Sequence, residues 1–142
     1  MSSAPNNKNT GEKVCLKLTE LYHYSTEKRS LTADNFFSSI KLVDTLLQKN
    51  FSYVGTLKKN KVEIPWQFLP SKTRVVNSSI FGFSDDKTLV SYVPKFNKSV
   101  ILISSEHHNK SFNLLNDNKP EIIEFYNATK GEFILNKKLI LN

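Results

Sequence analysis

The stretch that decides the fold is SLTADNFFSSIKLVDTLLQKNFSYVGTL, residues 30–57. Large apolar side chains recur every three or four residues from Asn35 to Lys49, which predicts a helix with one apolar face. The members of this stripe are Phe36, Phe37, Ile40, Val43, Leu46 and Leu47. Residues 51–57 are rich in aromatic and β-branched side chains and predict a strand, and a shorter run before Asp34 predicts another. The segment is typical of a strand–helix–strand unit.

Asp34 stands at the junction between the first predicted strand and the helix. A carboxylate there can cap the helix by accepting a hydrogen bond from a backbone N–H of the first turn. Ligands of open α/β sheets also gather at the carboxyl ends of strands, so the same side chain can serve a metal ion. The two roles are compatible, and the residues alone leave both open.

Residues 64–120 consist of short aromatic or β-branched runs broken by turn residues. SSIFGF (78–83) and TLVSYV (88–93) flank SDDK, which predicts a β-hairpin. KSVILISS (98–105) predicts a further strand, and the polar residues 107–120 predict a loop. This part of the chain is therefore expected to be rich in β-structure.

The remaining segments lie toward the two ends of the chain. PEIIEFYNATKG predicts a helix with Pro120 at its first position and Gly131 at its C-terminal stop. The tail, residues 132–142, has no clean period. Residues 1–12 are polar and predict disorder. A short helix is favoured just after them, with one face formed by Val14, Leu18 and Leu21.

The composition suits one modest globular domain, with 142 residues, 39% hydrophobic and 11% aromatic. Lys and Arg outnumber Asp and Glu by 20 to 13, and the net charge of +7 favours polyanionic partners, nucleic acid first. The single Cys15 excludes an intramolecular disulfide and fits a reducing compartment. No apolar run approaches the length of a membrane span, and the N-terminus lacks a signal-peptide core. We therefore expect an intracellular protein without a membrane partner.

Three lysines follow the strand predicted at 51–57, namely Lys58, Lys59 and Lys61. They can neutralise DNA phosphates, although a charge run of this kind is also typical of a solvated loop. The aromatic side chains nearby, Phe51, Tyr53 and Trp66, are interpreted as core or edge packing rather than as platforms for stacked bases.

Two further pairs of polar residues have simple structural interpretations. Asp85 and Asp86 are expected to be acids of the hairpin turn rather than a catalytic pair. His107 and His108 are adjacent, so their side chains do not converge on one metal ion, and no surrounding spacing matches a zinc site.

Five segments in a fixed order carry a family resemblance. They are DNFFSSIKLVDTLLQKN, YVGTLKKNKVEIP, FGFSDDKTLVSYVPK, VILISS and NKPEIIEFYNATKG. Their order and spacing resemble the transposase domain of the piggyBac family and of piggyBac transposable element-derived proteins, over roughly residues 11–131. The most specific pieces are the Asp-Asn-aromatic-Phe motif, the Val-Gly-Thr strand with its basic residues and Glu-Ile-Pro, and the Tyr-Asn-x-Thr-Lys-Gly stretch.

The resemblance implies an α/β fold with a ribonuclease-H-like core that is interrupted by a β-rich insertion. The chain would hold an incomplete version of that core. On this mapping residues 13–63 form the partial core and residues 64–119 the insertion. Residues 120–142 would form a helix that packs back on the core, followed by a tail that no longer resembles the family. Residues 1–12 lie before the core.

The resemblance also implies DDE-type DNA transposition with two Mg²⁺ ions held by three or more aspartates. Asp34 matches the second of these aspartates. The first belongs to a strand that would precede this sequence. The third falls at Ile134, where a Gly-Gly-Val-Asp pattern is expected, and Glu132 lies two positions too early.

One matching aspartate cannot hold a metal pair, so we expect a truncated transposase domain that is not an enzyme and needs no cofactor. Asp34 would be a vestigial metal position. By the same resemblance, Lys58 and Lys61 match basic positions that contact DNA, and we expect Lys59 to belong to the same DNA-binding site. Residual DNA binding in the nucleus is the corresponding expectation.

The absence of the family's first strand predicts a bare sheet edge, with low stability or dependence on a partner. An alternative function is an interaction module that associates with full-length transposase, or with itself, through that edge. An active nuclease is a third hypothesis, and it requires an acid such as Glu132 or Asp44 to replace the missing ligands.

Overall fold

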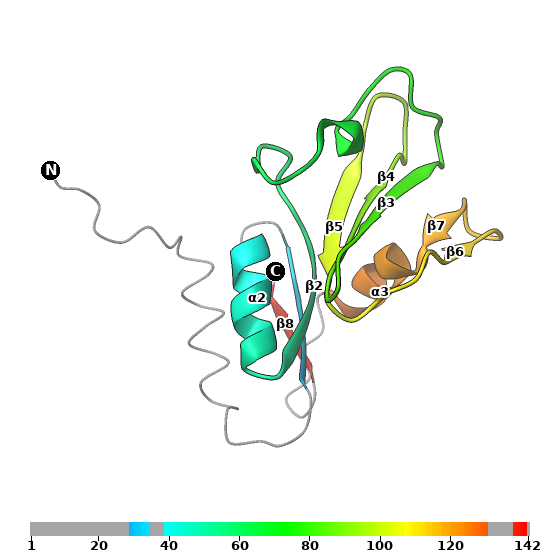
Figure 1. Ribbon diagram of the computed structural model, residues 1–142. Coiled ribbons are helices and arrows are strands. Elements are labelled where there is room, and N and C mark those ends of the chain that lie inside the picture. The colour runs from blue at the N-terminus through cyan, green and yellow to red at the C-terminus, as the bar shows by residue number, and fades with distance from the viewer. Residues whose placement is uncertain (1–28, 35–38, 131–137, 142) are drawn as a thin grey trace, which may run out of the picture.

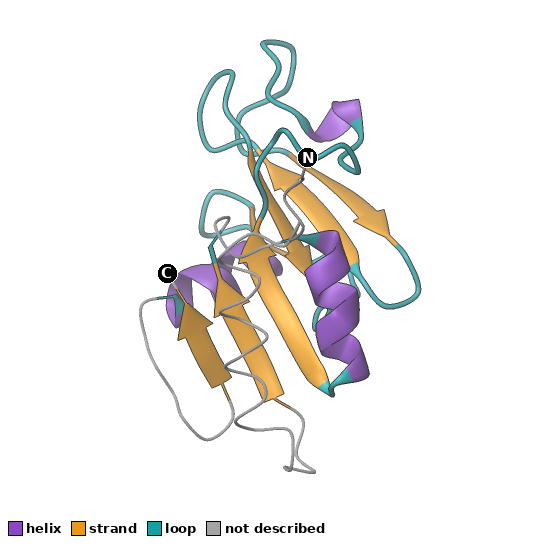
Figure 2. Ribbon diagram, turned by 90° about the vertical axis from the view of Figure 1, so that its left-hand side faces the viewer, coloured by secondary structure: helices purple, strands orange, loops and turns teal. Residues whose placement is uncertain are grey.

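The computed structural model describes residues 29–34, 39–130 and 138–141. In chain order the elements are β1 (Arg29–Ala33), α2 (Ile40–Gln48), β2 (Phe51–Thr56), the 3₁₀ helix η1 (Trp66–Phe68), β3 (Ser79–Phe83), β4 (Thr88–Tyr92), β5 (Val100–Ser104), β6 (Phe112–Asn113), β7 (Lys119–Pro120), α3 (Glu121–Thr129) and β8 (Lys138–Leu141). Six strands form one mixed sheet in the order β3-β4-β5-β2-β1-β8, and β6 pairs with β7. Figures 1 and 2 show α2 and α3 on opposite faces of the large sheet.

The predicted strand–helix–strand unit is present. β1 and β2 pair in parallel, with Leu31 opposite Tyr53, and α2 connects them. The helix is shorter at its start than the prediction from Asn35, because it begins at Ile40. Its N-cap is Ser39, which has an extended backbone and whose Oγ accepts a hydrogen bond from the N–H of Leu42 at 3.0 Å. The prediction that Asp34 caps this helix is therefore wrong.

Residues alternate between the two faces of the sheet, as the period of a β-strand requires. Leu31 and Tyr53 pack with α2, in the cluster that contains Val43 and Leu46. Val54, the neighbour of Tyr53, packs on the other face with Ile122 of α3. Both faces of β2 are buried, which explains its nearly continuous apolar sequence.

The predicted hairpin is confirmed, since β3 and β4 pair in antiparallel around residues 84–87. The strand predicted at 98–105 is also confirmed as β5, which pairs with β4 and, on its other side, with β2. The segment predicted as a loop contains the short β6–β7 pair instead. The β-rich part of the chain therefore continues the sheet of β1 and β2.

The second predicted helix is confirmed as α3. It ends at Thr129, and Pro120 is its N-cap rather than its first helical residue. Because proline has no N–H to donate and a fixed φ, it suits this start of a helix.

The bare edge expected beside the first strand is absent. β8 pairs in parallel with β1 along that edge, from Ser30 opposite Lys138 to Ala33 opposite Leu141. This pairing supplies hydrogen-bond partners to backbone groups that an open edge would leave exposed. The expectation was wrong because β8 comes from the tail at 132–142, in which no strand period was recognised.

Several predictions lie outside the described residues. They are the disorder of residues 1–12, the helix with Val14, Leu18 and Leu21, the early helical residues 35–38, and the positions Glu132 and Ile134. Among the helices that the structure describes, none is long and apolar enough to cross a membrane.

Candidate functional site

Asp34 lies directly after the carboxyl end of β1, as predicted, and its side chain is partly buried. The C-terminal end of α3 packs beside it. The hydroxyl of Thr129 lies 3.1 Å from that of Thr32, two residues before Asp34. The end of α3 is thereby joined to the end of β1.

Tyr126 of α3 is the aromatic side chain of this corner. Burial raises the pKa of its hydroxyl, a hydrogen bond with Thr56 lowers it, and the charge of Asp34 raises it, with a net increase. The ammonium of Lys130 lies 5.4 Å from the centre of the Tyr126 ring. Sequence reasoning missed the group of Thr56, Tyr126 and Lys130, because only the packing of α3 on the sheet brings Tyr126 to Thr56 of β2 and within reach of the charge of Asp34.

The described residues of this corner do not by themselves fit a pair of metal ions. A two-metal site needs several convergent carboxylates, whereas Thr56, Tyr126 and Lys130 supply two hydroxyls and a cation. No three His, Cys, Asp or Glu side chains form a metal-binding group within the part of the chain that the structure describes. Asp44, the acid considered as a replacement, forms an ion pair with Lys87 at 2.5 Å instead.

Lys58, Lys59 and Lys61 lie in the loop between β2 and β3. Lys58 and Lys59 are exposed, and Lys61 is half-buried. The loop starts at the carboxyl end of β2, and β1 is parallel to β2, so it leaves from the same end of the sheet as Asp34.

The structure adds three lysines to this set. Because β4 is antiparallel to β5, and β5 to β2, the loop 93–99 emerges at the same end of the sheet as the loop 57–78. We call the lysines of these two loops the basic rim: Lys58, Lys59, Lys61, Lys72, Lys95 and Lys98. None of them forms an ion pair with a carboxylate in the described ranges 29–34, 39–130 and 138–141. The sequence does not directly reveal the directions of the strands. It therefore could not show that the loops 57–78 and 93–99 lie at the same end of the sheet.

Hydrogen bonds hold the loop 57–78 against the end of β4 and the start of the loop 93–99. The guanidinium of Arg74 donates to Phe68 O at 3.1 Å, to Ser91 Oγ at 2.8 Å and to Ser91 O at 3.0 Å. Asn77 N–H donates to Val93 O at 2.7 Å. The loop 57–78 is thus fastened to the end of β4, and Figure 1 shows the two loops together above the sheet.

The aromatic residues near the lysines divide into two groups. Phe51 and Tyr53 are fully buried, which confirms their interpretation as core. Trp66 is 76% exposed, so its interpretation as packing is wrong. It precedes the 5%-exposed Phe68 by two residues within η1, and the short helix directs one aromatic inward and the other into solvent.

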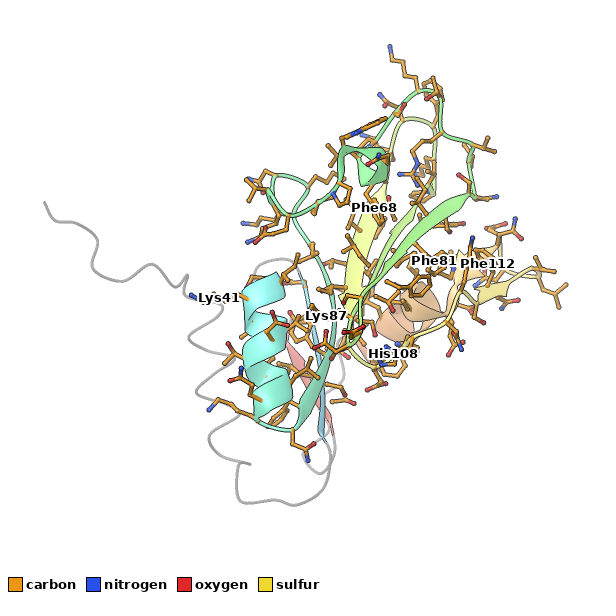
Figure 3. The ribbon with its side chains drawn as sticks, in the orientation of Figure 1. Lys41, Phe68, Phe81, Lys87, His108 and Phe112 are labelled. Atoms are coloured by element: carbon orange, nitrogen blue, oxygen red, sulfur yellow. The ribbon has the colours of Figure 1, made fainter. Side chains whose placement is uncertain are left out.

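The opposite end of the sheet carries charges that are bonded within the protein. Lys87 joins Asp86 of the hairpin turn at 2.8 Å and Asp44 of α2, and Figure 3 shows it between the hairpin and that helix. The hydrogen bond and charge of Lys87 lower the pKa of Asp86, net of an opposing effect of burial. Asp85 lies in the same turn, as predicted.

Further polar contacts lie at the same end of the sheet as Lys87. Ser52 donates to Glu106 Oε1 at 2.9 Å, and Ser30 contacts the same oxygen. Ser104 Oγ lies 2.9 Å from Nδ1 of His107, whose ring also packs edge-on against Phe125. Burial lowers the pKa of His107, although Glu106 and Glu121 oppose the shift. We interpret this group of serine, histidine and glutamate as part of the packing rather than as a catalytic group, because Ser104 is fully buried.

The comparisons with known proteins give the class to which the chain belongs. The chain belongs to the transposase family described as Transposase IS4, whose model matches residues 2–140. Within that class the chain is similar to a piggyBac transposase, solved by cryo-EM in a synaptic complex with hairpin DNA. The two share 37% sequence identity with a TM-score of 0.78, over 89% of this chain and 26% of that one.

These comparisons confirm the piggyBac resemblance and the mixed α/β fold. The chain spans about a quarter of the length of that transposase. A comparison with curated proteins finds no match.

Proposed function

We propose that this chain is a DNA-binding domain of the piggyBac transposase type that does not cleave DNA. The basic rim carries the first part of the proposal, because its lysines lie on adjacent loops and are exposed or half-buried. Cations that form no ion pair within the described residues are available to replace the counterions of a phosphate backbone. The similar transposase was solved with DNA, which supports the same class of ligand here.

The second part of the proposal concerns chemistry. Ile134 occupies the position of an expected aspartate, and its side chain offers no metal ligand. The charge of Asp34 acts on the hydroxyl of Tyr126, Tyr126 contacts Thr56 and Lys130, and Asp44 is already paired with Lys87. A single carboxylate does not hold two Mg²⁺ ions. We accordingly assign Asp34 the role of a vestigial position, and we infer from the family resemblance that the chain acts in the nucleus.

The same resemblance supports a finer fold assignment. β1, α2 and β2 would belong to a ribonuclease-H-like core, and β3 to β5 to its insertion. The parallel β1–β2 pair with a crossing helix supports the first part, and the antiparallel β3–β4–β5 meander supports the second.

DNA binding is tested by titrating a fluorescently labelled duplex with the full chain at several salt concentrations. The variant Lys58→Gln/Lys59→Gln/Lys61→Gln is expected to bind more weakly, with a log–log salt slope reduced by about 0.9 for each phosphate that the variant no longer neutralises. The matched control is Lys49→Gln/Lys110→Gln/Lys119→Gln, which removes three charges outside the basic rim. Absence of binding at low salt, or equal weakening by both variants, would contradict the proposed surface.

Cleavage is tested with a supercoiled plasmid, Mg²⁺ and the full chain, beside an intact piggyBac transposase as a positive control. We expect no nicking above background, and no difference between the natural chain and Asp34→Asn. Nicking that requires Mg²⁺ and disappears in Asp34→Asn would overturn the assignment.

The alternative function, capture of full-length transposase through a bare edge of β1, is less well supported. β8 covers that edge, so an incoming strand would have to displace it. Co-purification with full-length transposase that is abolished by a proline at Thr32 in β1 would revive this alternative.

A further inference from the structure

Two exposed aromatic side chains accompany the lysines of the basic rim. Trp66, in η1, is 76% exposed, and Phe96, in the loop between β4 and β5, is 63% exposed. Phe96 lies between Lys95 and Lys98 in sequence, and Trp66 follows Lys61 by five residues. Large apolar surface of this kind is unfavourable in water and gains free energy when a ligand covers it.

The backbone beneath Trp66 is firmly held. Phe68 is buried and its carbonyl accepts hydrogen bonds from Ser91 Oγ at 2.6 Å and from Arg74 at 3.1 Å. Leu69 N–H donates back to Trp66 O at 3.1 Å, closing η1. The indole is therefore presented to solvent from a fixed support, which lowers the entropy lost when a ligand stacks on it.

The chemistry of the surroundings selects the ligand. An exposed aromatic set among lysines is poorly matched to an apolar protein surface, which would have to bury those charges. It is well matched to a nucleic-acid strand, whose phosphates meet the lysines and whose bases offer flat faces. In a duplex those faces are already stacked on one another, so only unpaired bases can use Trp66 and Phe96.

We propose that the basic rim, with Trp66 and Phe96, binds DNA that contains unpaired bases in preference to duplex, and that the bases stack on these two side chains. This inference rests on the proposed DNA binding and adds a preference among DNA structures. Removing the aromatic partner of a stacked base should weaken binding by roughly 5- to 150-fold.

Trp66 is the single tryptophan of the chain, so its fluorescence reports on this surface alone. The full chain is titrated with a single-stranded oligonucleotide and, separately, with the duplex of the same sequence. We expect strong quenching and tighter binding with the single strand. Equal affinity for both forms with an unquenched Trp66 would overturn the inference while leaving DNA binding intact. Absence of binding to both would instead overturn the proposed function.

Variants distinguish the contribution of stacking from that of charge, and the measured quantity is the affinity for labelled DNA. Trp66→Leu and Phe96→Leu should each weaken single-strand binding and leave duplex binding unchanged, and Trp66→Tyr should restore most of the affinity. Phe83→Leu is the control, since Phe83 is also exposed but lies at the other end of the sheet. Folding is checked by circular dichroism. Weaker binding of both DNA forms by Trp66→Leu, or an equal weakening in Phe83→Leu, would contradict stacking.

Discussion

The two ends of the sheet carry charge in different ways. At the end that bears the basic rim, Lys58, Lys95 and their neighbours face solvent without a carboxylate partner among the described residues. At the other end, Lys87, Glu106 and His107 are bonded to side chains of the protein itself. A charge that already has an internal partner must give it up before it can bind a ligand. The first end is therefore suited to recognition, and the second to holding the fold.

Arg74 is the exception at the recognition end, because its charge is used internally. Replacing it with Met should destabilise the protein by about 2–4 kcal/mol, since the carbonyls of Phe68 and Ser91 would be left without a charged donor. Urea unfolding followed by circular dichroism measures the change. Arg74→Lys should recover only part of the stability, because an ammonium cannot reproduce the forked hydrogen bonds. Full stability in Arg74→Met would show that the loop 57–78 is held by other contacts.

The next largest loss of stability is expected from removing the cap of α2. It distinguishes the role of Ser39 from that of Asp34. Ser39→Ala removes the hydrogen bond to the N–H of Leu42 and should cost about 1 kcal/mol. Asp34→Ala should cost clearly less, because Asp34 does not cap α2. Thermal unfolding of the two variants under the same conditions makes the comparison. A larger destabilisation in Asp34→Ala would mean that the contacts of Asp34 are more important to the fold than the cap.

That comparison also shows how far the sequence could predict the structure. The periodicity around Val43 and the aromatic run from Phe51 specified α2 and β2, since both patterns are local and repeat over several residues. The cap was misplaced because Asp34 and Ser39 are both good capping residues, and tertiary packing decides where a helix starts. β8 was missed because a four-residue strand is too short to show a recognisable period.

The candidate site was predictable only where its residues are neighbours in sequence. Lys58, Lys59 and Lys61 were recognised as one group. Lys95 and Lys98 were not added to it, because the antiparallel pairing of β4 with β5 is needed to bring their loop alongside. Trp66 was taken for packing because local sequence does not distinguish the inward aromatic of η1 from the outward one.

At the end of the sheet opposite the basic rim, the ion pairs of Lys87 should make a small, salt-dependent contribution to stability. Burial lowers the pKa of Lys87, but its hydrogen bonds to Asp44 and Asp86 raise it further, so the net pKa is increased. Lys87→Met should cost less than about 1 kcal/mol, because the side chains of both acids are 49% and 55% exposed. Unfolding at low and high salt should show the difference shrinking as salt screens the pairs. An effect that salt does not alter would indicate a packing role for the Lys87 stem.

The smallest expected effect is a dependence of stability on pH that originates at His107. Burial lowers the pKa of His107 below its ordinary value of 6.5. The unfolded chain therefore binds the proton more readily than the folded one, so the contribution of this group is complete above pH 6.5 and declines as the pH falls below it. Urea unfolding between about pH 7.5 and 5.5 should show this decline in the natural chain and a flatter profile in His107→Gln. If the free energy of unfolding depended on pH equally in the natural chain and in His107→Gln, His107 would have to be accessible to solvent in the folded state. The hydrogen bonds at this end of the sheet would then bury it less than they indicate.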